Sequence, residues 1–127
     1  MAEFLSGHLA VDLVYHPSLS SHSSYATAKK LLSGNGGVVS FTLKDESENA
    51  LKIFYDREFS SMMKAPSIGS NQTLICPYTL LTNYFYTDDE LKEIKLPRHL
   101  IRISAGCETE IDGILDDLDL ELKRTIQ

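Results

Sequence analysis

Arg102 is the residue of this chain that most clearly suggests chemistry. It lies in the middle of a short apolar segment, residues 99–103, and the sequence Ser104-Ala105-Gly106 follows it. A guanidinium group held inside an apolar strand needs an anion beside it, because an unpaired buried charge is costly. The anion could be the carboxylate of a ligand, or an aspartate or glutamate elsewhere in the chain. The residues alone leave both interpretations open.

Other residue patterns argue against several kinds of site. The four histidines share no metal-ligand spacing, so no metal site is expected. The glycine-rich turn at residues 34–37 lacks the Gly-Lys-Ser/Thr continuation of a phosphate loop. The serines around His22 have no strained turn or placed acid that would make one of them a nucleophile. All eight lysines lie in polar contexts typical of solvated surface side chains.

Composition indicates one ordinary globular domain. The chain has 127 residues, a net charge of −6 and 43% hydrophobic residues, which is enough to bury a core. Lys29-Lys30 is its only basic cluster, so nucleic acid and anionic membrane surfaces are not expected as partners.

The sequence also predicts a compartment. No apolar run approaches the length of a membrane span, and the first residues do not resemble a signal peptide. Cys76 and Cys107 are too few for a disulfide framework. We therefore expect no membrane association and a cytoplasmic location.

Strands and helices are expected to alternate along the chain. Apolar and β-branched runs predict strands at residues 9–15, 38–43, 62–65, 73–76 and 99–103. Helical periodicity and caps predict helices at residues 2–8, 24–32, 45–58, 87–94 and 109–126. The glycine-rich turn at residues 34–37 is expected to end the second helix, and Pro77 is expected to stop the fourth strand.

These elements predict an α/β protein of the α+β type. The expected architecture is a two-layer sandwich, with about five short and mostly antiparallel strands and helices packed on one face. No repeat or linker divides the chain, so residues 1–127 are expected to form a single domain.

Five segments, in order, resemble the C-terminal domain of the Cys/Met-metabolism enzymes that use pyridoxal 5′-phosphate (PLP). Residues 15–22 resemble Y-P-G-L-x-S-H, and Ala28-Lys29 lies where the A-K of the family follows. Residues 36–41 resemble G-G-x-x-S-F. Residues 66–69 and 73–75 resemble S-L-G-x-x-E-[ST]-L, and residues 100–106 resemble L-[IV]-R-[LI]-S-[VA]-G. The likeness covers residues 3–123 and is greatest to cystathionine γ-synthase-like proteins. Gln72, Asn83 and Cys107 depart from the family pattern.

The resemblance implies a substrate-anchoring role. Arg102 would bind the α-carboxylate of an amino-acid substrate, with Ser67 and Ile68 beside it. The parent would be a PLP-dependent transferase or lyase of transsulfuration and methionine biosynthesis, acting on β- or γ-substituted amino acids.

The resemblance also implies what this chain leaves to the rest of the parent. The cofactor lysine would belong to an N-terminal domain of the same polypeptide, in a homo-tetramer. This chain would hold no catalytic or cofactor-binding residue and would be inactive alone.

Two other interpretations remain. The changes at Gln72 and Asn83 are compatible with a regulatory or interaction module that keeps the fold without catalysis. The order of elements also fits a small-molecule sensor of the ferredoxin-like kind, which would leave the motifs unexplained.

Overall fold

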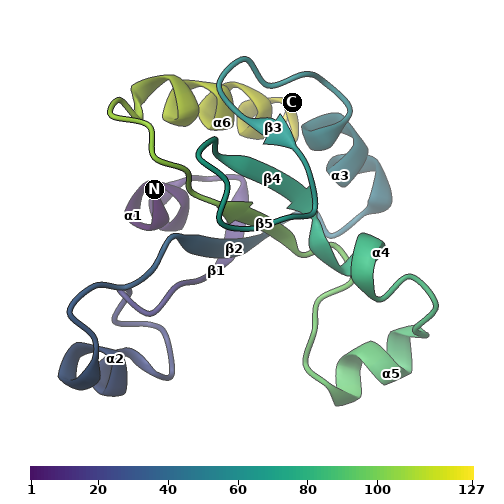
Figure 1. Cartoon of the computed structure of the whole chain (residues 1–127). Helices are drawn as coiled ribbons and strands as arrows, with labels where there is room; N and C mark the ends of the chain where they lie inside the picture. The colour runs from purple at the N-terminus through teal and green to yellow at the C-terminus, as the bar shows by residue number, and fades with distance from the viewer.

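A single sheet organises the molecule (Figure 1). The structure is a computed structural model that describes all 127 residues. The strands are β1 (Val11–Tyr15), β2 (Val38–Leu43), β3 (Met63–Lys64), β4 (Leu74–Pro77) and β5 (Ile101–Ser104). Their order in the sheet is β1-β2-β5-β4-β3, and every neighbouring pair is antiparallel except the parallel pair of β3 and β4. The predicted fold class is therefore confirmed.

Three helices contribute side chains to the core on one face of this sheet. The helices are α1 (Ala2–Gly7), α2 (Tyr25–Leu31), α3 (Glu48–Tyr55), α4 (Tyr78–Thr82), α5 (Asp88–Glu93) and α6 (Asp112–Arg124). Figure 1 shows α3 and α6 together on one side of the sheet. Phe54 of α3 meets Phe41 of β2 edge to face at 5.8 Å, and Leu118 and Leu122 of α6 are fully buried in the same core. This is the layer that the helical periodicity predicts.

The opposite face is covered differently. In Figure 1, α2 and α5 project from opposite ends of the sheet, on the side away from α6. The first belongs to the connection between β1 and β2, and the second, with α4, to the connection between β4 and β5. No helix lies over the middle of this face. We call it the helix-free face.

Two local features differ from what the sequence predicts. Pro77 ends β4 as expected, but it is also the N-cap of α4, a helix that the sequence did not predict. A proline is tolerated there because the start of a helix leaves its N–H groups without intrahelical partners. The second helix ends at Leu31, with Leu32 in extended backbone, so the glycines do not terminate it. The left-handed residue, Gly36, lies in the loop beyond.

Candidate functional site

Arg102 reaches the helix-free face because of simple strand alternation. Ile101 and Ile103 are fully buried in the core beneath α3 and α6. Side chains alternate between the faces of a strand, so Arg102 and Ser104 point the other way. Arg102 lies opposite Ser40 of β2 and Cys76 of β4. The apolar and polar roles of this strand are therefore divided between its two faces.

The guanidinium group of Arg102 is held without any carboxylate. Its Nη2 donates to the carbonyl oxygens of Pro66 at 2.6 Å and Ser67 at 2.9 Å. Its Cζ lies 4.9 Å from the centre of the Tyr78 ring. The ion pairs of the structure do not include Arg102. Of the two interpretations left open by the sequence, an internal ion pair is therefore not the one observed.

The thiol of Cys76, the neighbouring residue on β4, does not supply an anion for Arg102 either. Cys76 is a free and almost fully buried cysteine. Burial raises the pKa of its thiol, and the nearby Arg102 only partly opposes this effect. The thiol is therefore neutral at ordinary pH and does not neutralise the charge of the Arg102 guanidinium.

Ser67 and Ile68 lie in the loop that contacts this arginine. Ser67 meets Arg102 through its backbone carbonyl, and its hydroxyl makes only a long contact of 3.5 Å to the carbonyl of Ile68. The Ile68 side chain is 60% exposed. The structure thus brings Ser67 to Arg102. Ile68, the next residue after Ser67, remains exposed to solvent.

The residues after Arg102 fasten this loop. The N–H of Gly69 donates to the hydroxyl of Ser104 at 3.4 Å, and the N–H of Cys107 donates to the carbonyl of Asn71 at 2.9 Å. A Cβ at Gly106 would lie 2.5 Å from the Asn71 oxygen. Glycine is therefore required at position 106 by the close approach of two backbones.

Thr73 and Glu108 complete this attachment, and sequence reasoning missed both. The Glu108 carboxylate accepts hydrogen bonds from the N–H of Thr73 and, at 2.9 Å, from its hydroxyl. Thr73 is fully buried and also accepts from the N–H of Gly106 at 2.9 Å. Burial acts to raise the pKa of Glu108, but these donors and its own backbone N–H outweigh it and hold the pKa below its usual value. The carboxylate thus remains charged and clamps the loop.

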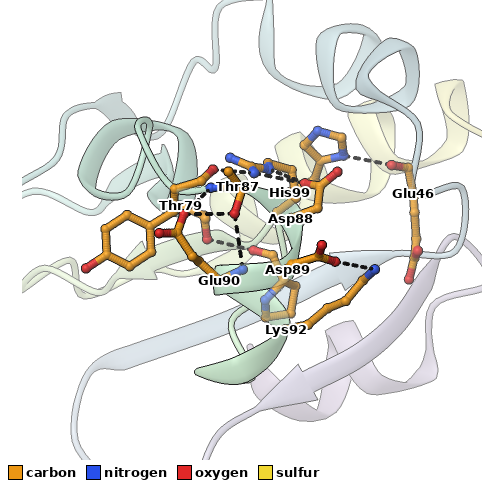
Figure 2. Close-up of polar contacts among 11 residues, drawn as sticks. Glu46, Thr79, Thr87, Asp88, Asp89, Glu90, Lys92 and His99 are labelled. Atoms are coloured by element: carbon orange, nitrogen blue, oxygen red, sulfur yellow. Dashed lines mark hydrogen bonds and ion pairs between the residues drawn. The ribbon is translucent and has the colours of Figure 1, made fainter.

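A groove of about 380 Å³ lies elsewhere, between the end of β2, the start of α3 and α5. Figure 2 shows that several of its polar groups already have partners. His99 shares a hydrogen bond of 2.7 Å with the Glu46 carbonyl, and Arg98 bonds Asp88 at 2.9 Å. Thr87 and Glu90 form a capping box at the start of α5. The Arg98–Asp88 pair attaches α5 to the segment before β5, and the His99–Glu46 contact attaches that segment to the loop before α3, so we assign the groove a structural role.

The lysines do not fit a covalent PLP site. All eight are solvent-exposed, and several are engaged at the surface, as in the pair of Lys52 with Glu48 at 2.8 Å. A cofactor-binding lysine must instead present its amine inside an enclosed site. In this structure no lysine amine lies in such an enclosed site. None of the helices has the length and apolar character needed to cross a membrane.

Comparisons with known proteins show which family this chain belongs to. Residues 1–123 match the family model described as Cys/Met metabolism PLP-dependent enzyme. The chain is 37% identical over 124 residues to a cystathionine beta-lyase of Lactococcus lactis subsp. cremoris, covering 98% of this chain and 32% of that protein. It is 32% identical to an L-methionine gamma-lyase of Fusobacterium nucleatum, with coverage of 98% and 31%.

A solved structure shows the same fold. The crystal structure of cystathionine gamma synthase from Xanthomonas oryzae pv. oryzae in complex with cystathionine superposes with a TM-score of 0.88 at 31% identity, covering 98% of this chain and 32% of that one. The chain thus spans about a third of the length of the relatives it matches. Because the family model covers nearly every residue, this chain belongs to the PLP-dependent enzyme family of Cys/Met metabolism.

Proposed function

We propose that residues 1–127 are the C-terminal, substrate-anchoring domain of a longer PLP-dependent enzyme that acts on β- or γ-substituted amino acids. The chain matches about a third of each relative, and those relatives are named as lyases and a synthase. The cofactor lysine then belongs to an N-terminal domain of the same polypeptide. The assembled enzyme is a cytoplasmic homo-tetramer, and the isolated chain is inactive.

The state of Arg102 carries this proposal. Its guanidinium group is oriented by two carbonyls and a ring, and has no acidic partner. A guanidinium has five N–H donors, so those on Nε and Nη1 remain for a ligand. We assign them the α-carboxylate of the substrate, bound by charge-assisted hydrogen bonds beside Ser67 and Ile68.

Anchoring the carboxylate contributes to catalysis through position. A substrate fixed at one end presents its α-carbon in one orientation to the groups that react with it. PLP, when bound in the parent enzyme, supplies an electron sink for the negative charge that develops at that carbon. This chain supplies the orientation and none of the reacting groups.

The test is turnover of L-cystathionine by the full-length enzyme and its Arg102→Ala and Arg102→Lys variants. Loss of the charge-assisted contact is expected to lower kcat/KM by about 3 kcal/mol, or roughly 150-fold, in Arg102→Ala. Lysine keeps the charge but not the planar donors, so Arg102→Lys should recover only part of the activity. An unchanged kcat/KM in both variants would remove Arg102 from the substrate site, whereas a full-length parent protein without any turnover would favour a non-catalytic module that retains the fold.

A further inference from the structure

Tyr78 is the aromatic neighbour of Arg102. The centre of its ring lies 4.9 Å from the Cζ of Arg102. Cations are attracted to the face of an aromatic ring, and guanidinium groups stack on such faces. We propose that Tyr78 is a positioning residue for carboxylate recognition, which fixes the plane of the Arg102 guanidinium. This inference rests on the proposed function of Arg102.

The backbone holds the Tyr78 ring in place. Pro77 pairs with Ile101 in the sheet, and the N–H of Tyr78 then donates to the carbonyl of Leu100 at 2.8 Å. Tyr78 is also the first residue of α4. Its Cα is therefore fixed both to the edge of the β4–β5 ladder and to a helix, so the ring offers a firm support.

The ring and the two carbonyls restrain Arg102 in complementary ways. Hydrogen bonds from Nη2 to Pro66 and Ser67 fix the direction of that group. The Tyr78 ring lies on another side of the group, with the Arg102 Cζ over it at 4.9 Å from the ring centre, and restricts movement of the guanidinium toward that side. Arginine carries considerable rotamer entropy, so restraining it before the ligand arrives strengthens binding.

The aromatic face, not the hydroxyl, performs this task. Tyr78 makes its hydrogen bonds through its backbone, which donates to Leu100 and accepts from the hydroxyl of Thr82 at 2.9 Å. Its hydroxyl makes none in the structure. A phenylalanine should therefore replace Tyr78 with little loss, whereas an aliphatic side chain should not.

The experiment compares Tyr78→Phe, Tyr78→Leu and Tyr78→Gln in the full-length enzyme, with L-cystathionine as substrate. Loss of the ring is expected to raise KM between about twofold and thirtyfold while kcat changes much less. Tyr78→Phe should keep KM within about twofold of the parent value. Tyr78→Gln repeats the test with a polar side chain if the leucine variant folds poorly.

A double-variant cycle separates positioning from simple bracing. In an Arg102→Ala background, Tyr78→Leu should cause no further rise in KM, because the ring then has no guanidinium to orient. If Tyr78→Leu raises KM equally in the parent and in the Arg102→Ala background, the inference is overturned. It is also overturned if Tyr78→Leu and Tyr78→Gln leave KM unchanged while Arg102→Ala lowers kcat/KM. If Arg102→Ala itself has full activity, the proposed function fails first, and the role of Tyr78 fails with it.

Discussion

The two faces of the sheet have different roles, although the same strands form both. Beneath α3 and α6, Ile101 and Ile103 of β5 are fully buried among apolar neighbours. On the helix-free face, Arg102 of the same strand is held by loop carbonyls and one ring, with no acidic partner. One face maximises apolar burial, and the other keeps a charge available.

This contrast indicates which positions determine the stability of the fold and which determine substrate recognition. Changes beneath α3 and α6 should lower the free energy of unfolding. Replacement of Arg102 itself should alter substrate recognition more than stability. Substitutions on each face, followed by unfolding free energy and by turnover, therefore test this division.

The largest effect is expected beneath the helices. Leu118 is fully buried in α6, so Leu118→Ala should lower the free energy of unfolding by about 2–5 kcal/mol through lost burial and a residual cavity. Denaturant unfolding measures this change. Leu120 of the same helix is 51% exposed, and Leu120→Ala is the matched control, expected within about 1 kcal/mol of the parent. Equal losses for the two variants would contradict the assignment of this face.

The next effect belongs to the loop beside Arg102. In Gly106→Ala, the new Cβ would approach the backbone of Asn71 and Gln72 at 2.5 Å, so the loop must move. We expect a loss of about 1–3 kcal/mol in unfolding free energy, together with a reduced kcat/KM in the full-length enzyme. A Cβ at Gly34 would meet nothing within 4 Å, so Gly34→Ala should leave both quantities nearly unchanged. A harmless Gly106→Ala would show that the loop does not need this close approach.

The smallest effect concerns acid stability. The folded pKa of Glu108 lies below its usual value, so its contribution is present above the unfolded pKa, near about 4.3, and is lost as pH falls through the folded pKa. Glu108→Gln should therefore flatten the fall in unfolding free energy below about pH 4.5, by less than about 1 kcal/mol. Denaturant unfolding at several pH values measures the slope, with exposed Glu110→Gln as control. Identical slopes for Glu108→Gln and the parent would exclude the clamp.

Much of the fold follows from local sequence patterns. The alternation of residues 38–43 predicts β2 with its observed bounds, and the apolar spacing of α6 predicts its buried face. Helix α4 escaped prediction because five residues carry little periodicity. The end of α2 was misplaced because glycines permit a left-handed cap without requiring one.

The site was only partly predictable. Alternation within β5 places Arg102 opposite the core, and the family resemblance indicated the loop of Ser67. Tyr78, Thr73 and Glu108 were missed because their contacts depend on how β4 and β5 are paired and on the path of the loop. No short-range pattern encodes these distances.

The most direct test of the account measures two quantities on one substitution, Arg102→Ala in the full-length enzyme. If Arg102 is kept for a ligand, the free energy of unfolding should fall by only about 1–2 kcal/mol, because two hydrogen bonds to loop carbonyls are lost but no ion pair is. The kcat/KM for L-cystathionine should fall by about 3 kcal/mol. A large loss of stability with unchanged kcat/KM in the folded enzyme would contradict the account and make Arg102 a structural brace.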